Sequence, residues 1–141
     1  MTQVDIAKAV GLAPSAVLER LRKLEARQVI QGYTARVDPH AAGCSLLAFI
    51  AVRTSEIGAD EDRVGAALAE VPGVMEVHHV AGEDCFLVKI RARDTEHLGQ
   101  LLKTSIGGVK GVRSTRTTIV LGTHKETSAI PVEGALVGSK V

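Results

Sequence analysis

The stretch VGLAPSAVLERLRKLE (Val10–Glu25) begins with a turn and continues as a helix. Gly11 ends the segment before it, and Pro14 suits the first helical position because its missing N–H is not needed there. Apolar residues then recur at the spacing of one helical face. They are Val17, Leu18, Leu21 and Leu24. The stretch therefore predicts a turn followed by an amphipathic helix.

The residues before Gly11 predict a second, shorter helix. Thr2 and Asp5 are spaced as a helix-capping pair at its start. Where two helices meet across a tight turn, the first needs a small residue against the second. Ala7 has that place opposite Val17. The two helices and their turn predict a helix-turn-helix.

The outer face of the longer helix is polar and mostly basic. The side chains in the N-terminal half of this helix are small enough for it to enter a DNA major groove. Its basic side chains are placed to contact phosphates or guanine edges. The candidate DNA-contacting residues are Pro14, Ser15, Ala16, Glu19, Arg20, Arg22 and Lys23. Glu19 and Lys23 are also an i, i+4 pair of the kind found on ordinary exposed helices, so the helical wheel alone leaves both interpretations open.

A second domain is predicted beyond a linker at residues 38–44. Residues 27–40 have alternating apolar positions and predict a short strand before that linker. Strands are then expected at 45–53, 73–81, 85–92 and 111–122, and helices at 60–70 and 95–105. This order is that of a ferredoxin-like βαββαβ sandwich, so the fold class is α+β. The sheet has one bare face, which favours a homodimer.

The predicted domains are a helix-turn-helix at residues 1–37, the linker, the sandwich at 45–124 and a tail at 125–141 without clear periodicity. Residues 1–45 hold six Lys and Arg against four acids, which leaves +2 there and −1 in the rest of the 141-residue chain. That asymmetry has the right sign for a polyanion partner near the N-terminus. Cys44 and Cys85 suggest no disulfide framework, and no apolar stretch approaches membrane-spanning length, so we expect a cytoplasmic protein.

A loop is predicted between the two middle strands, in VAGEDCFLVKI (Val80–Ile90). Gly82 permits a backbone conformation closed to other residues, and Glu83 and Asp84 place two carboxylates where a small ligand could reach them. Glycine and acids are equally the ordinary residues of a polar hairpin turn. The spacing alone favours the plain turn.

The N-terminal region resembles the DNA-binding module of the Lrp/AsnC family of transcription regulators. The matching residues are Gly11, Leu12, Pro14, Val17, Arg20, Arg22, Leu24, Glu25, Ile30, Gly32 and Tyr33. The resemblance covers roughly residues 1–125 and implies an incomplete winged-helix domain joined to a RAM/ACT-like sandwich. It also implies binding to double-stranded DNA in the nucleoid and assembly of homodimers into tetramers or octamers.

The resemblance further implies that an amino-acid effector binds between dimers, with no other cofactor. We expect no metal, because no pair of candidate ligands has suitable spacing. The residues carried over by position are Val80, Gly82, Glu83, Asp84, Cys85, Thr95, Thr118, Ile119 and Val120. Cys85 occupies the place where many members have Asp, and Asp84 is displaced by one residue. The specificity of the family therefore does not transfer.

Two further departures concern the N-terminal domain. Ala13 stands where the family has Ser or Thr, so the second helix lacks a side-chain cap, which costs about 1 kcal/mol. The family has one more helix before the position where this sequence starts. We therefore expect apolar surface to stay exposed on Ile6, Val10, Val17 and Leu21.

Two alternatives come from other classes of protein. One is an effector-binding oligomerisation protein without DNA binding. The other is an enzyme like the sirohaem decarboxylases, which resemble this family in fold and have histidines in the sheet domain. His78 and His79 keep that option open, although neighbours on a strand point to opposite faces and cannot share a metal. No catalytic constellation can be placed, so we expect a regulator and not an enzyme.

Overall fold

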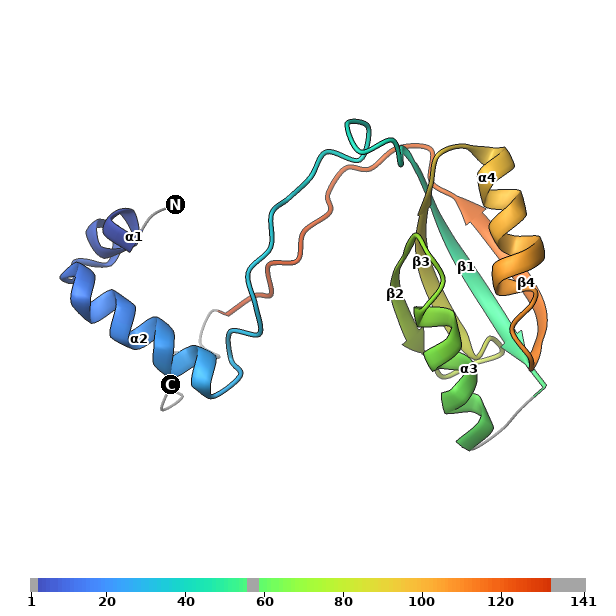
Figure 1. The fold of residues 1–141 in the computed structure, drawn as a ribbon, viewed down its shortest axis with the longest axis horizontal. Helices are drawn as coiled ribbons and strands as arrows, with labels where there is room; N and C mark the ends of the chain where they lie inside the picture. The colour runs from blue at the N-terminus through green and yellow to red at the C-terminus, as the bar shows by residue number, and fades with distance from the viewer. Residues whose placement is uncertain (1–2, 56–58, 133–141) are drawn as a thin grey trace. The chain divides into compact units, whose positions relative to one another are not determined.

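The structure is a computed structural model that describes residues 3–55 and 59–132 (Figure 1). The contacts divide the chain into two compact units. One comprises Met1–Arg36 with Thr127–Val141, and the other comprises Val37–Glu126. Thr2 of the predicted capping pair and residues 133–141 of the predicted tail lie outside the described residues.

The first unit contains the predicted pair of helices, α1 (Gln3–Val10) and α2 (Pro14–Ala26). Gly11 turns the chain with φ +71°, a backbone conformation that glycine adopts without strain. The backbone N–H of Leu12 donates to the oxygen of Ala7, at 2.9 Å, and closes α1. Ala13 makes no side-chain cap to α2, as predicted.

The predicted exposure of apolar surface in this unit is correct for Val10, which is 58% exposed, and wrong for Val17, which is 3% exposed. Ala7, also 3% exposed, is small enough to let the two helices approach and cover Val17. Ile6 and Leu21 are half-buried.

The predicted strand within residues 27–40 is wrong, because the structure has no regular element there. A strand needs a partner for its backbone groups, and none of the described strands pairs with this segment. Val29 and Tyr33 stay exposed. The Tyr33 hydroxyl instead donates to Glu25 Oε1 of α2 at 2.6 Å, and this bond raises the pKa of Tyr33.

The second unit is the predicted sandwich. Its strands are β1 (Leu46–Thr54), β2 (Val74–His79), β3 (Phe86–Ala92) and β4 (Val112–Ile119), in the antiparallel order β2-β3-β1-β4. Its helices are α3 (Ala59–Ala69) and α4 (Thr95–Gln100), and α4 continues as the π-helical segment η1 (Leu101–Ile106). The fold class and the element order are confirmed, although the predicted helix at 95–105 changes its winding halfway.

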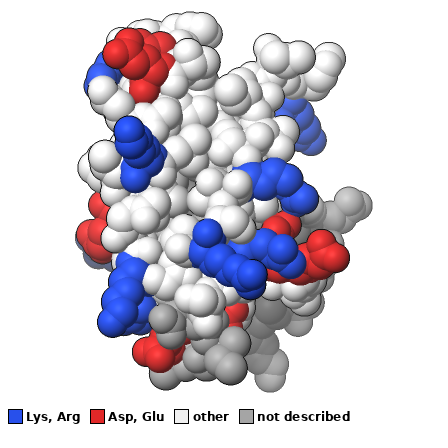
Figure 2. All heavy atoms as spheres, turned by 90° about the vertical axis from the view of Figure 1, so that its right-hand side faces the viewer, with Lys and Arg blue, Asp and Glu red and all other residues white. Residues whose placement is uncertain are grey.

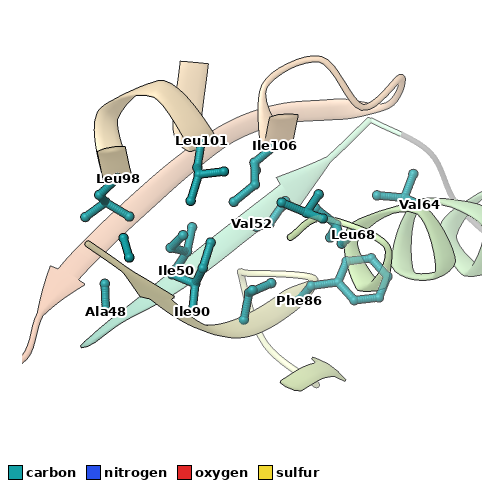
Figure 3. Packing of buried hydrophobic residues seen from close by; sticks show 13 residues of the cluster. Ala48, Ile50, Val52, Val64, Leu68, Phe86, Ile90, Leu98, Leu101 and Ile106 are labelled. Carbon is teal, nitrogen blue, oxygen red and sulfur yellow. The ribbon is translucent and has the colours of Figure 1, made fainter. Parts of the chain in front are cut away.

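The core lies between one face of the sheet and these helices (Figure 3). Alternate residues of β1 point into it, since successive strand side chains face opposite sides. Ile50 and Val52 are fully buried there against Leu68 of α3 and Ile106 of η1. This packing leaves the odd-numbered positions of β1 and β3 on the opposite face.

That opposite face of the sheet has no helix over it among the described residues and carries an ion-pair network. Lys89 of β3 contacts Glu76 of β2 at 3.4 Å and also Glu126, which follows β4. Arg91 Nη2 lies 3.1 Å from Glu126 Oε1. Two basic residues of β3 therefore hold the chain beyond β4 against the sheet.

We expect Glu126→Gln to lower the melting temperature at pH 7 by at most a few degrees. The ion pairs, with Lys89 first, hold the pKa of Glu126 below its ordinary value of 4.5. A carboxyl with a lowered pKa contributes stability above that ordinary value and loses it as the pH falls through the folded-state pKa. Melting curves at pH 7 and pH 3 test this. The difference between variant and wild type should become smaller at pH 3 than at pH 7, and an equal difference at both pH values would contradict it.

Candidate functional site

The predicted DNA-contacting residues lie on the exposed side of α2. Six of them are exposed, and Ala16 is half-buried beside the buried Val17. Lys23 Nζ lies 3.7 Å from Glu19 Oε1, so the predicted i, i+4 pair exists. In the part of the chain that the structure describes, no acid pairs with Arg20 or Arg22. Two uncompensated guanidinium groups thus extend from this helix.

The loop between β2 and β3 is held by hydrogen bonds at both of its ends. The N–H of Val80 donates to the Cys85 oxygen, and the N–H of Cys85 donates to the Val52 oxygen, each at 3.0 Å. Gly82 between them has φ +135°, which confirms that this position needs glycine. The loop is therefore anchored to the end of β1.

Two arginines that were not predicted from the sequence contact this loop. Arg53 Nε of β1 donates to the backbone oxygen of Glu83 at 3.1 Å. Arg116 Nη2 of β4 lies 2.8 Å from Asp84 Oδ2. Among the described residues the Glu83 side chain has no such partner and is exposed. The two neighbouring carboxylates differ, since one is paired and the other is open.

These groups surround a pocket of ≈ 200 Å³ on the helix-free face of the sheet. It is lined by Ala51, Arg53, Glu83, Asp84, Ser114, Thr115 and Arg116. Only Glu83 and Asp84 were predicted. The pairing of Ala51 with Arg116 brings the arginine there, and a register between strands so far apart in the sequence leaves no local signal.

The other predicted effector residues lie at the opposite end of the sheet. Thr118 and Ile119 pair with Phe49 and Ala48, near the start of β1, whereas Cys85 bonds to Val52 near its end. Thr95 begins α4 after the end of β3, also near the start of β1. Counting Val120, the two clusters lie three to five residues apart along β1, roughly 10–17 Å. One chain therefore does not bring all nine residues together.

The two adjacent histidines face opposite sides of the sheet, as predicted. His78 Nε2 bonds to Glu76 Oε1 on the helix-free face, and His79 Nε2 bonds to Glu61 Oε1 of α3, each at 2.8 Å. His79 also stacks on Phe86, with ring centroids 5.0 Å apart. The described residues contain no group of three or more metal-binding side chains.

Figure 2 shows one side of the sheet unit. Its Lys and Arg side chains are spread among uncharged ones, with acidic side chains close by. A polyanion-binding surface needs basic groups gathered on one face. The arrangement on this side thus gives less support for DNA contact than the open cations of α2. In the described ranges 3–55 and 59–132, no helix is long and apolar enough to cross a membrane.

Family models match both parts of the chain. Residues 1–31 match a winged helix-turn-helix DNA-binding model, and residues 47–130 match the Lrp/AsnC ligand binding domain. A DNA-binding helix-turn-helix followed by a ligand-binding sandwich defines a class, that of transcriptional regulators that respond to a small molecule. Within that class, the chain belongs to the Lrp/AsnC family.

Relatives and solved structures agree with this assignment. The chain is 42% identical to the HTH-type transcriptional regulator FL11 of Pyrococcus horikoshii over 92% of this chain and 83% of that protein. It is 33% identical to the leucine-responsive regulatory protein of Salmonella typhimurium over 94% and 82%. A Neisseria meningitidis transcriptional regulator in complex with L-Met is similar with a TM-score of 0.88 and 25% identity, over 96% of this chain and 88% of that chain. The feast or famine regulatory protein of M. tuberculosis complexed with L-methionine is similar with a TM-score of 0.80 and 35% identity, over 92% and 86%.

Proposed function

We propose that this regulator reads DNA with α2 and binds a free α-amino acid at the loop between β2 and β3. The observation that carries the effector site is the charge arrangement of the loop pocket, with an open carboxylate on Glu83 and guanidinium groups on Arg53 and Arg116. An α-amino acid carries one group of each sign. The pocket offers a partner for both.

The DNA contact follows from the exposed face of α2. Ser15 and Ala16 occupy its N-terminal turn, where small side chains let a helix approach base edges, and Arg20, Arg22 and Lys23 follow within two turns. In this proposal two such helices from one dimer meet half-sites about one helical turn of DNA apart, about 34–36 Å. DNA binding places the protein in the cytoplasm with the nucleoid. No enzymatic step is part of the proposal, and relatives are named as regulators.

The ammonium group of the effector is assigned to Glu83. Asp84 is already paired with Arg116, so its carboxylate is engaged, whereas that of Glu83 is open. The effector carboxylate is assigned to Arg116 and Arg53, which retain further N–H donors. The L-Met and L-methionine complexes of two similar structures support an amino acid as the class of ligand.

The second cluster, with Thr95, Thr118, Ile119 and Val120, joins the same site in our proposal from another copy of the chain. A single amino acid cannot span the roughly 10–17 Å that separate the clusters within one chain. Apolar side chains on the helix-free side also favour a homodimer, since Leu87 is 39% exposed there. Effector binding between dimers then changes assembly or the spacing of the DNA-binding helices.

Titration calorimetry of the full chain with L-methionine and other free amino acids tests the effector site. Glu83→Gln should weaken binding of the preferred amino acid about 10- to 100-fold, because it removes a charge-assisted hydrogen bond. Glu70→Gln, another exposed acid directly after α3, is the matched control and should bind as wild type. N-acetyl-L-methionine, which lacks the ammonium group, should not bind. Unchanged affinity in Glu83→Gln would refute the assignment.

A further inference from the structure

Arg22 and Glu25 are neighbours on the surface of α2, since they lie three residues apart in a helix. The other residues three or four positions from Glu25 are Leu21, Gln28 and Val29, so Arg22 is the only charged residue at that spacing. An acid and a base at this spacing commonly form an ion pair. In the part of the chain that the structure describes, Glu25 and Arg22 form none, because the carboxylate has a different partner.

That partner is Tyr33, whose hydroxyl donates to Glu25 Oε1 at 2.6 Å. A hydroxyl bonded to a carboxylate makes a short, charge-assisted hydrogen bond, which is stronger than a bond between neutral groups. The bond also raises the pKa of Tyr33, so the phenol remains a donor at neutral pH. The Glu25 carboxylate is therefore held toward the segment after α2 and not toward Arg22.

The backbone after α2 brings Tyr33 back to the helix. Gln28 has φ +60°, a left-handed conformation that few residues with a side chain adopt. Two backbone bonds close the helix in the Schellman pattern. The N–H of Val29 donates to the Leu24 oxygen at 2.9 Å, and the N–H of Gln28 donates to the Glu25 oxygen at 3.0 Å. This turn reverses the chain, so that Tyr33 contacts the side chain of a residue eight positions before it.

We propose that Tyr33 is a positioning residue for DNA binding. By holding the Glu25 carboxylate, its hydroxyl keeps the Arg22 guanidinium unpaired and available to DNA. Without the hydroxyl, the carboxylate turns back one helical turn to Arg22, and DNA must break that ion pair before it contacts the guanidinium. This role rests on the proposed reading of DNA by α2, and it requires no contact between Tyr33 and DNA.

A purely structural role for the Tyr33 hydroxyl would give a different result. Tyr33 is 72% exposed, so its ring is not part of a core, and Tyr33→Phe keeps that ring. If the hydroxyl only held the segment after α2 in place, its loss would weaken DNA binding whatever the charge at position 25. In our proposal the weakening requires the Glu25 carboxylate and the Arg22 guanidinium. Removing the carboxylate therefore distinguishes the two roles.

Fluorescence anisotropy of the full chain on the DNA upstream of its own coding region, at low salt, tests the proposal. Tyr33→Phe should weaken binding about twofold for each α2 that reads a half-site, and hence about fourfold for a dimer, because an ion pair at this spacing shifts an equilibrium by about that factor. Tyr33→Phe combined with Glu25→Gln should bind at least as tightly as wild type. Thr34→Val, which removes a neighbouring exposed hydroxyl, is the matched control and should bind as wild type.

The outcomes separate this role of Tyr33 from the proposed function itself. If wild type does not bind the DNA, reading by α2 is refuted and the role of Tyr33 falls with it. If wild type binds, equal binding of Tyr33→Phe, or a double variant as weak as Tyr33→Phe, would overturn the role of Tyr33 alone. A second measurement needs no DNA. The NMR signal of the Arg22 Nε–H group should shift in Tyr33→Phe and return to its wild-type position when Glu25→Gln is added, and an unchanged signal in Tyr33→Phe would also overturn the proposal.

Discussion

Replacing Arg22 with Gln should weaken binding to the DNA upstream of the protein's own coding region by about 5- to 150-fold, because a good bidentate contact to a base contributes about 1–3 kcal/mol. Arg22 is exposed on α2, and none of the acids in the described residues compensates its charge. The side chain is therefore available to a base edge or a phosphate. Fluorescence anisotropy or a gel shift at low and moderate salt measures the effect.

The same experiment separates a base contact from a phosphate contact. Loss of a phosphate contact lowers affinity for every sequence and makes the slope of log K against log salt shallower by about one, whereas loss of a base contact changes the preferred sequence. Arg36→Gln, an exposed arginine beyond α2, is the matched control and should bind as wild type. No shift of wild type at either salt concentration would instead favour the oligomerisation protein that does not bind DNA.

Gly73→Ala should destabilise the sheet unit by about 2–4 kcal/mol. Gly73 has φ +91°, and a methyl group added there would lie 2.5 Å from the backbone oxygen of Arg91. The two segments are also joined by a bond from the Arg91 N–H to the Gly73 oxygen, at 2.9 Å. The clash is with backbone, so relief requires β2 and β3 to separate locally. Chemical denaturation followed by circular dichroism measures the change.

Gly99→Ala is the control for this prediction. Gly99 lies in α4, and nothing lies within 4 Å of the position where its new methyl group would stand. Because alanine favours a helix over glycine by about 1 kcal/mol, this variant should be neutral or more stable. Equal destabilisation by both substitutions would contradict the steric explanation for Gly73.

The sandwich could be predicted well because each of its elements carries its own signal. The apolar run that became β1 was placed within a residue of its observed bounds, and the helix expected at 60–70 was observed at Ala59–Ala69. The strand predicted within residues 27–40 was wrong. Alternation of apolar and polar residues shows which side chains favour burial, but it does not show whether a partner strand exists. The change of winding at Leu101 was not predicted, because the apolar spacing of that segment also fits one continuous helix.

The residues of the candidate sites also differ in whether the local sequence reveals them. Contiguous groups, such as the α2 face and the loop around Gly82, could be read directly from the sequence. Arg53 and Arg116 could not, because only strand register brings them to the loop pocket. Glu83 and Asp84 were both candidates for binding the effector, and only the bond between Asp84 and Arg116 distinguishes their carboxylates.

The separation of the two candidate effector clusters along β1 has a consequence for the cell. If an amino acid can be enclosed only where two chains meet, ligand affinity and subunit assembly are thermodynamically linked. More protein then means tighter effector binding, and more effector means larger assemblies. The effector concentration at which such a regulator responds would then depend on how much of the regulator the cell contains. Any feedback on its expression would therefore also change that effector concentration.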